Sequence, residues 1–462
     1  MIFSKQNIDL EINNAVPDLS WVNEWIANVK DYIFVRAEDN VFIQRPNKAF
    51  HLNDQGISIM QQLLDGKSIE NVLSLYGHNP RAGYDINIFL QDLRKMLKNG
   101  IDDTYESSAV EKKAFSMEFS KFPVLSEIAI TYKCNAKCLF CYAGCGSEGM
   151  DGDKNREMSL DEIKSIINKI YYQAKVPSVS FTGGEPTLRP DLPEMVEYAR
   201  SIGMRVNLIT NGTLSTDRLV NRLKNAGLQS AQISLEGAAS RIHDRMTCVN
   251  GSFNKTIDAV KRYRDADITV HTNTTLTNIN KEDALEIPGL VKELGMEAFS
   301  MNLMIPTGNG AINDTIGINY RDIGALLKKI SSVSKKHAID FKWYSPVPMC
   351  MFNTILHGFG NKGCSACDGL ISINPEGQVL PCASYDKPLG SLLSDSFEMI
   401  WNKPETKQIR TKSFAHGICR ACEYFHICNG ACPLYWRQTG YDELVSLHKR
   451  NSGVEAAHDR YS

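Results

Sequence analysis

The sequence lacks any long apolar run. No stretch of 18 consecutive apolar residues occurs in its 462 residues, and a helix needs about 20 to cross a bilayer. The segment Met1–Leu10 has no apolar core of the kind that secretory signal peptides carry. The net charge is only −2, which gives no overall attraction to nucleic acid or to an anionic membrane. These absences predict a cytoplasmic protein with neither nucleic acid nor membrane as a partner.

Cysteine is absent from the first 133 residues and then becomes frequent. Of the 13 cysteines, four lie within 134–145 and seven within 364–432, while Cys248 and Cys350 stand apart. In a reducing compartment, grouped cysteines are more often metal ligands than disulfides. We interpret the two separate cysteines as ordinary buried thiols.

The length suggests about three domains. Residues 1–110 are predicted to form a small α+β unit that resembles a winged helix. A hairpin is expected from Tyr32–Arg36 and Val41–Gln44, followed by helices that begin at Asn53, at Ser68 and near Asp85. Residues 102–120 are charged and weakly patterned, which indicates a linker.

Residues 122–340 alternate between strand and helix patterns. Gly203, Gly227 and Gly295 stand where helices need a left-handed terminating residue. The alternation predicts an α/β fold with a parallel sheet, and polar motifs follow the strands at their carboxyl ends, where such folds place their sites. Six strands are expected: Glu127–Ile130, Ser178–Phe181, Arg205–Ile209, Ala231–Ser234, Ile268–His271 and Ala298–Met301.

The first cysteine group has the spacing C-x3-C-x2-C, formed by Cys134, Cys138 and Cys141. Three thiolates can hold three irons of a [4Fe–4S] cluster and leave the fourth iron open, whereas an electron-transfer cluster normally takes four cysteines. A zinc loop, or a four-ligand site that includes Cys145, is the alternative. Thr182–Pro186 follows the next strand, where two glycines permit a close approach and Glu185 can accept a hydrogen bond from an ammonium group.

Together, the cysteines, Phe140 and Gly183-Gly184-Glu185-Pro186 resemble the radical S-adenosylmethionine (SAM) superfamily. The resemblance implies a partial (β/α)6 TIM-like barrel in which the open iron binds SAM, Phe140 lies near the adenine, and Gly183, Gly184 and Glu185 hold the methionyl ammonium. Glu236 stands where the family has Asp, and Lys255 where relatives often have Arg. The further cofactor-binding candidates, each of which can instead be a turn or core residue, are Thr210, Ser234, Glu236, Lys255, Asn273 and Met304.

Residues 345–462 form a cysteine-rich third region, with a hairpin at 370–380 and two short helices at 396–401 and 404–410. Its C-x2-C-x5-C-x3-C motif resembles the SPASM extension, which holds two auxiliary [4Fe–4S] clusters and so implies three clusters in all. The implied ligands are Cys364, Cys367, Cys382 and Cys432 for the first, and Cys419, Cys422 and Cys428 for the second. Structural zinc is the alternative.

The second auxiliary cluster lacks one expected ligand. The family usually adds a further cysteine downstream, but no cysteine follows Cys432 here. The cluster is therefore expected to use a non-cysteine ligand such as Asp442 or His448, or to keep an open iron, with Cys350 as a less favoured substitute.

The helix expected at Ser68–Leu75 has no Lys or Arg, so DNA binding by this winged helix is disfavoured. Peptide binding by strand addition at the hairpin's edge is the alternative. Val35–Leu97 resembles the leader-peptide recognition element of the peptide chaperone in pyrroloquinoline quinone synthesis. A simple packing domain is the other interpretation.

These resemblances imply a radical SAM peptide-modifying oxidoreductase: a maturase that binds a ribosomally synthesised precursor peptide through its leader and forms a thioether or other intrapeptide crosslink. It would need an external one-electron reductant, flavodoxin or ferredoxin. The alternatives are a cofactor- or tetrapyrrole-tailoring radical SAM enzyme, and a non-catalytic iron–sulfur electron carrier or DNA-binding regulator.

Overall fold

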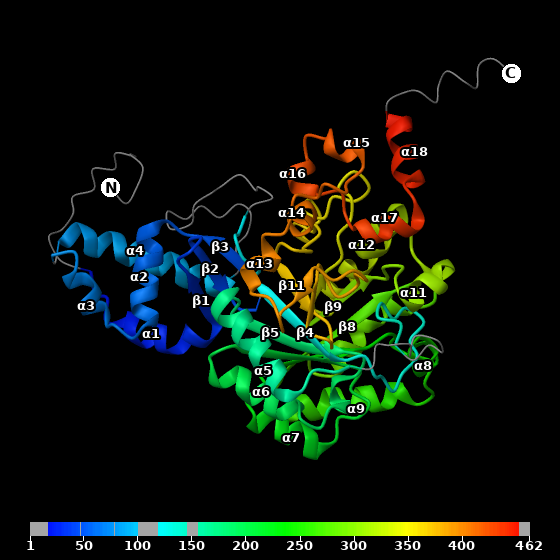
Figure 1. The fold of residues 1–462 in the computed structure, drawn as a ribbon, viewed down its shortest axis with the longest axis horizontal. Helices are drawn as coiled ribbons and strands as arrows, with labels where there is room; N and C mark the ends of the chain where they lie inside the picture. The colour runs from blue at the N-terminus through cyan, green and yellow to red at the C-terminus, as the bar shows by residue number, and fades with distance from the viewer. Residues whose placement is uncertain (1–16, 47, 78, 100–118, 146–155, 452–462) are drawn as a thin grey trace. The chain divides into compact units, whose positions relative to one another are not determined.

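The computed structural model describes residues 17–46, 48–77, 79–99, 119–145 and 156–451 (Figure 1). The described residues form two compact units, one up to residue 125 and the other from residue 126 onward. Most of the linker expected at 102–120 lies outside the described residues, as do residues 1–16 and 452–462. Within the described part of the chain, no helix is long and apolar enough to cross a membrane.

The described residues of the first unit form a three-stranded antiparallel sheet and four α-helices. Strand order is β1-β2-β3, so β1 and β3 are the outer strands. Asn53 and Ser68 cap the next helices through their side chains, as predicted. The elements are α1 (Trp21–Val29), β1 (Ile33–Arg36), β2 (Val41–Gln44), β3 (Lys48–His51), α2 (Asp54–Leu64), α3 (Ile69–Ser74) and α4 (Pro80–Asn99).

The structure of this unit differs from the prediction in detail. Strand β3 was not expected, and Phe50 within it pairs with Phe42 of β2. The sequence Lys48–His51 is too short to show a strand period, so only the pairing with β2 defines it. The helix α1 was not expected, and α4 begins at Pro80 rather than near Asp85.

The second unit is built on a parallel sheet. All six expected strands are present, but a seventh parallel strand, β10, pairs with β9. The expectation of six was therefore wrong, because the four-residue edge strand carries Asp340 and Lys342 and is too short to stand out. The strands are β4 (Leu125–Thr131), β5 (Ser178–Gly183), β6 (Arg205–Thr210), β7 (Ser230–Ser234), β8 (Thr269–Leu276), β9 (Ala298–Leu303) and β10 (Asp340–Trp343).

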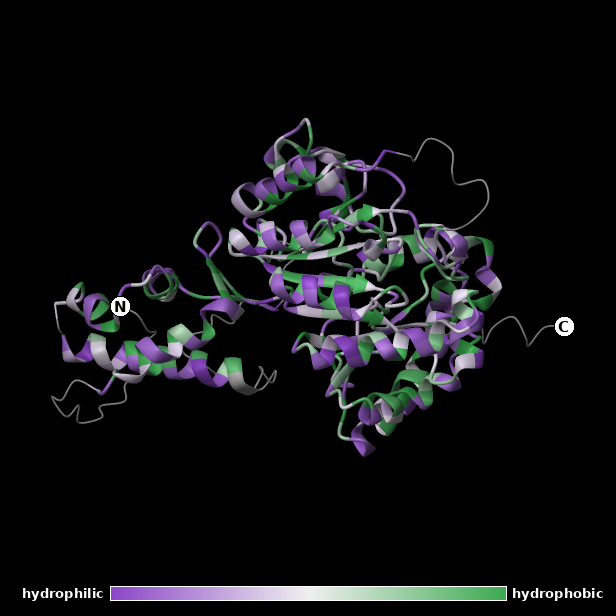
Figure 2. Ribbon diagram, turned by 90° about the horizontal axis from the view of Figure 1, so that it is seen from below, coloured by the Kyte–Doolittle hydropathy of each residue, from purple (hydrophilic) through white to green (hydrophobic). Residues whose placement is uncertain are grey.

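Helices follow most of these strands, and Figure 1 shows α5, α6, α7 and α9 along one side of the sheet. Gly203, Gly227 and Gly295 have positive φ, as predicted for helix ends. The helix ribbons carry hydrophilic and hydrophobic faces, as Figure 2 shows. The main helices are α5 (Leu160–Asn168), α6 (Leu192–Ser201), α7 (Asp217–Asn225), α8 (Ser240–Thr247), α9 (Ser252–Asp265), α10 (Ile287–Glu293), α11 (Asn309–Ile312) and α12 (Tyr320–Lys336).

The cysteine-rich region continues the same sheet. Strand β11 (Leu370–Ile373) lies next to β4, and β12 (Gln378–Leu380) pairs antiparallel with β11, which confirms the predicted hairpin. The predicted helices appear as α13 (Phe397–Trp401) and α14 (Pro404–Arg410). Further elements that were not predicted are β13 (Gly390–Ser391), α15 (Gly417–Arg420), α16 (Phe425–Cys428), α17 (Pro433–Thr439) and α18 (Asp442–Asn451).

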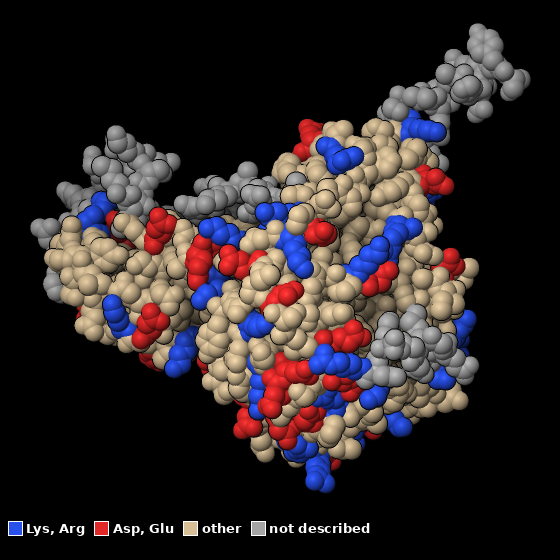
Figure 3. Space-filling view, viewed as in Figure 1, with Lys and Arg blue, Asp and Glu red and all other residues tan. Residues whose placement is uncertain are grey.

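Charge is mixed on the visible surface. On the face in Figure 3, Lys and Arg atoms are interspersed with Asp and Glu atoms. This agrees with the net charge of −2, and this face offers no broad basic field for a nucleic-acid backbone.

Candidate active site

The first three cysteines lie in the loop that follows β4. Burial raises the pKa of Cys134 to about 11, and it raises the pKa of Cys138 well above the usual value, with the charges of Cys141 and Glu236 adding to the effect. Positively charged irons would reverse this penalty, because a metal stabilises the thiolate form. The donor set therefore fits an iron–sulfur cluster.

A fourth cysteine lies beside this group. A hydrogen bond with the Cys145 thiol lowers the pKa of Cys141 to about 6 and raises that of Cys145. Among the described residues, no three Cys, His, Asp or Glu side chains converge as a single metal ion would require. In a cluster each iron takes its own thiolate, so cluster ligands need not converge on one point.

The cysteine loop is held by two elements far along the sequence. Lys137 and Leu139 donate backbone hydrogen bonds to Thr247 and Met246 at the end of α8, at 3.1 and 3.0 Å. The buried Asn309 donates from its backbone to the Cys141 carbonyl at 2.8 Å and from its amide to the Cys138 carbonyl at 3.0 Å. Sequence reasoning missed Asn309, because nothing local shows that α11 lies against this loop.

Gly183 and Gly184 lie directly under the start of the loop. A Cβ on Gly183 would be 2.1 Å from the Thr131 carbonyl oxygen, and one on Gly184 would be 2.3 Å from that of Lys133. The Gly184 and Glu185 amides donate to the same two carbonyls, at 2.8 and 2.9 Å. The glycines therefore admit the protein's own backbone, a reason that differs from the ligand approach expected from the sequence.

Glu185 is fully buried, and its carboxylate already has protein partners. One oxygen accepts from Thr187 and from the Thr210 hydroxyl at 2.7 Å, and the other accepts from the Asn211 amide at 2.8 Å. Burial raises the pKa of Glu185, which these hydrogen bonds partly offset. Glu185 thus ties the ends of β5 and β6 together; its contact with an ammonium group stays a prediction.

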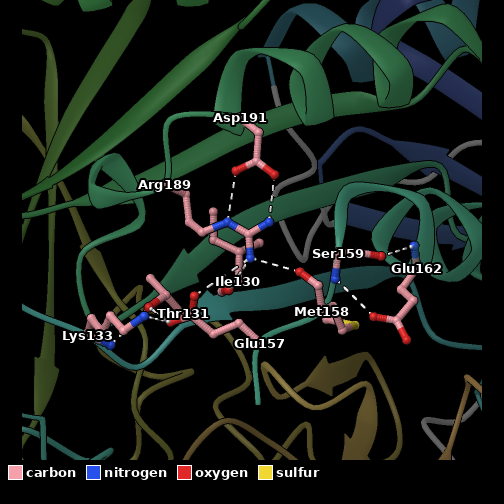
Figure 4. Close-up of polar contacts among 9 residues, drawn as sticks. All are labelled: Ile130, Thr131, Lys133, Glu157, Met158, Ser159, Glu162, Arg189 and Asp191. Atoms are coloured by element: carbon pink, nitrogen blue, oxygen red, sulfur yellow. Dashed lines mark hydrogen bonds and ion pairs between the residues drawn. The ribbon is translucent and has the colours of Figure 1, made fainter. Parts of the chain in front are cut away.

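Arg189 contacts the end of β4, and Figure 4 shows its hydrogen bonds. Its guanidinium makes paired bonds to Asp191 at 2.8 and 2.7 Å and donates to the Met158 and Ile130 carbonyls at 2.9 and 3.3 Å. Glu157 accepts from the Thr131 hydroxyl at 2.6 Å. A capping box of Ser159 and Glu162 starts α5 in the same region. Neither Arg189 nor Glu157 was among the predicted site residues.

The structure places the remaining predicted cofactor-binding residues in different surroundings. Thr210, Ser234 and Glu236 lie at or just after the carboxyl ends of β6 and β7, and Phe140 is half-buried in the loop. Asn273 of β8 bonds to Asn302 and accepts from Ser300, at 2.6 and 2.9 Å. Lys255 is exposed on α9, and Met304 is buried with its side chain beside Gly310 and Gly317.

Glu236 is buried and close to the cysteine loop. Its carboxylate accepts from the Thr275 amide at 2.8 Å, and its own amide donates to His243 at 3.1 Å. Burial raises the pKa of Glu236 to about 8, against a smaller lowering by the Thr275 hydrogen bond. The carboxyl is therefore mostly protonated near neutral pH and can donate a hydrogen bond.

The C-terminal cysteines form two further groups. Burial raises the pKa of Cys432 to about 12 and that of Cys382 well above the usual value, and the Cys364 charge adds to both shifts. Burial likewise raises the pKa of Cys367 to about 12, with Cys364 adding and Lys412 opposing. Cys364, Cys367, Cys382 and Cys432 thus lie within range of one another's charge, and this donor set also fits an iron–sulfur cluster.

The second group surrounds a cavity of about 970 Å³, lined by Cys419, Cys422 and Cys428. The prediction that Cys248 and Cys350 are buried thiols was wrong, because both are exposed. Cys350 lines the same cavity, as does His448. Asp442 is not among the lining residues.

Comparison with known proteins decides the family. Residues 128–294 match the model of the radical SAM superfamily, and residues 364–423 match that of the SPASM iron–sulfur cluster-binding domain. A probable GTP 3',8-cyclase of Saccharolobus islandicus is 30% identical over 261 residues, which cover 55% of this chain and 81% of that protein. The chain belongs to the radical SAM superfamily.

This radical SAM enzyme is also similar to an AdoMet-dependent heme synthase of Methanosarcina barkeri. The two are 29% identical over 333 residues, which cover 69% of this chain and 93% of the relative. Among solved structures it resembles Streptococcus suis SuiB bound to the precursor peptide SuiA, with a TM-score of 0.67 and 17% identity, over 89% of this chain and 96% of that one. The two matched domains imply SAM and [4Fe–4S] clusters as cofactors.

Proposed function

We propose that this enzyme matures a ribosomally synthesised precursor peptide and forms a thioether or other intrapeptide crosslink. The observation that carries the proposal is the first unit, which the chain has in addition to the sheet that bears the cysteine loop. The heme synthase match spans nearly all of that relative yet leaves almost a third of this chain unmatched. The likeness to SuiB covers more of the chain than residues 126–462 can supply, so it extends into the first unit.

The first unit has features suited to a peptide rather than DNA. Its outer strands β1 and β3 are candidates for strand addition by a leader peptide. Strand β3 is partly exposed, with Lys48 exposed and Ala49, Phe50 and His51 half-buried. The short helix α3 carries Glu70 and no Lys or Arg, so it lacks the charge that phosphate contacts require.

In the proposed enzyme, Cys134, Cys138 and Cys141 would hold the SAM cluster, and the C-terminal groups would hold two auxiliary clusters. SAM and its cluster would supply the radical chemistry needed to remove hydrogen from the peptide. Gly183, Gly184 and Asn309 keep the loop in place, and protonated Glu236 can donate a hydrogen bond near the cofactor. The reductant is an external one-electron donor, flavodoxin or ferredoxin.

A tetrapyrrole-tailoring activity is the second candidate, because the heme synthase resembles this chain over 93% of its own length. Such a reaction would give the first unit no substrate to recognise. The two candidates therefore differ in whether that unit contacts the substrate.

The test is hydrogen exchange and turnover with one peptide. The reconstituted enzyme is mixed with a short peptide encoded beside its gene, and amide exchange is compared with and without it. We expect protection of Lys48–His51, and with SAM and dithionite a peptide product lighter by two hydrogens per crosslink. Helix α4, the unit's longest helix, is the internal control for a general change in exchange. Turnover of a tetrapyrrole but of no peptide, with no protection in β3, would contradict the proposal.

A further inference from the structure

We propose that Cys350 is the fourth cysteine ligand of the second auxiliary cluster, together with Cys419, Cys422 and Cys428. The inference rests on the proposed presence of that cluster. It assigns a residue outside the matched segment 364–423, and one that precedes the cysteine motif instead of following it.

The cavity brings the four cysteines together. Its volume of about 970 Å³ is bounded by residues 348–353 on one side and 418–430 on another, with Leu444, Leu447 and His448 of α18. Apart from the cysteines the lining is mainly apolar and aromatic, and it includes Met349, Ile418, Tyr424 and Phe425. Such a lining offers few ligands that could compete with the four thiols.

The turn that carries Cys350 is fixed on both sides. The Pro348 carbonyl accepts hydrogen bonds from the Met351 and Phe352 amides, at 2.9 and 3.0 Å. The Met349 amide donates to the Cys428 sulfur at 3.3 Å, so the residue before Cys350 already touches an expected ligand. On the other side Phe352 is buried against Gly324 of α12, where a Cβ would be 2.5 Å from the Phe352 ring.

Geometry alone brings these thiols together. Cys350, Cys419, Cys422 and Cys428 line the same cavity, and the amide next to Cys350 donates to the Cys428 sulfur. Of the candidate ligands at this cavity, a thiolate matches iron–sulfur chemistry better than the imidazole of His448.

Four thiolates on four irons leave no open iron at this cluster. The cluster would then carry electrons without binding the substrate. A peptide thiolate would have to be bound elsewhere, so this cluster gives no support for thioether formation over other crosslinks.

Iron counting tests the assignment. In a background with Cys134, Cys138 and Cys141 all changed to Ala, two auxiliary clusters give about eight irons per chain. We expect Cys350→Ala, like Cys419→Ala, to lower this toward about four, and to change the electron paramagnetic resonance spectrum of any cluster that persists. His448→Ala and Asp442→Ala should leave both iron content and spectrum unchanged. If Cys350→Ala keeps its full iron content while Cys419→Ala loses iron, the second auxiliary cluster is present and the assignment of Cys350 is wrong. If neither variant loses iron, the second auxiliary cluster is absent.

A second measurement uses the unaltered enzyme, in case Cys350→Ala fails to fold. Thiol alkylation of the loaded protein should spare Cys350 and modify it after iron is removed with a chelator. Cys248 is exposed and should react in both states, which makes it the matched control. Equal modification of Cys350 before and after chelation would overturn the inference.

Discussion

Gly184 shows how little space separates β5 from the cysteine loop. Its amide donates to the Thr131 carbonyl at 2.8 Å, while the Lys133 carbonyl occupies the place of a side chain. Backbone atoms cannot rotate away as a flexible side chain can. The requirement for glycine at position 184 therefore comes from the fold, and it would apply even without a ligand.

We expect Gly184→Ala to displace the loop, since its Cβ would lie 2.3 Å from the Lys133 oxygen. Overpacking of this kind costs about 1–3 kcal/mol. Iron bound at the first cysteine group and 5′-deoxyadenosine formation should both fall, while auxiliary iron stays. Gly417→Ala is the control, because a Cβ there meets nothing within 4 Å. Equal iron and activity in both variants would show that the contact is not needed.

Glu236 gives a pH-dependent prediction. Its pKa is about 8 in the folded protein against 4.5 as the ordinary value, so the folded state holds a proton that the unfolded chain releases. The contribution of Glu236 to the free energy of unfolding therefore falls as pH rises from about 4.5 to about 8, and this contribution is constant above that range. Between pH 6 and pH 8 the loss is about 2–3 kcal/mol.

Glu236→Gln removes the ionisation while it keeps a similar shape. We expect the difference in Tm, that of Glu236→Gln minus that of the unaltered enzyme, to increase as the pH is raised from 6 to 8. Parallel Tm curves for the two proteins across this range would show that Glu236 does not titrate there.

At the scale of elements, local sequence patterns predicted the longer helices and strands and missed several short ones. The capping box of α5, the caps of α2 and α3, and the six main strands follow from side-chain spacing. Strands β3 and β10 and helix α11 each have four residues, too few to show a period. Pairing and packing with distant parts of the chain define them instead.

Helix α11 is a short element that was not predicted, yet its Asn309 supports the cysteine loop. Asn309→Ala would remove the amide that supports the Cys138 carbonyl in a buried site, at about 1–3 kcal/mol. We expect faster chelator removal of iron from the first cysteine group and unchanged removal from the C-terminal groups. Asn225→Ala, at an exposed position in α7, is the control. If iron leaves both variants at the same rate, α11 does not anchor the loop.

In the first unit, Arg36 connects the β1–β2 hairpin to the chain segment at 122–123. Its buried guanidinium pairs with Asp39 at 2.8 Å and donates to the Pro123 carbonyl at 2.7 Å. Arg36→Ala leaves Asp39 buried without this partner, which costs about 3–5 kcal/mol. Arg81→Ala breaks a 3.5 Å pair with Asp85 in which the arginine is exposed, and it should cost less than about 1 kcal/mol. Hydrogen exchange in β1 and β2 measures the difference; equal effects would contradict the buried role of Arg36.

At the scale of the whole chain, spacing identified two cysteine motifs, and the resemblance to the SPASM extension divided the C-terminal cysteines into two groups. The C-x3-C-x2-C and C-x2-C-x5-C-x3-C patterns are local and readable. Cys350 has no local partner in sequence and joins its group only because the 348–352 turn meets α16. The continuity of β11 with β4 was also not readable, because it depends on pairing between strands more than 200 residues apart.

Cys134, Cys138 and Cys141 are proposed to support SAM cleavage that modifies a peptide. The most direct measurement is 5′-deoxyadenosine formed by reconstituted enzyme with SAM, dithionite and the candidate peptide, together with the peptide's mass. We predict both products for the unaltered enzyme and for Cys145→Ala, and neither when the three cysteines are changed to Ala, although iron remains at the C-terminal sites. Absence of 5′-deoxyadenosine from the unaltered enzyme, or its persistence in the triple variant, would contradict the claim.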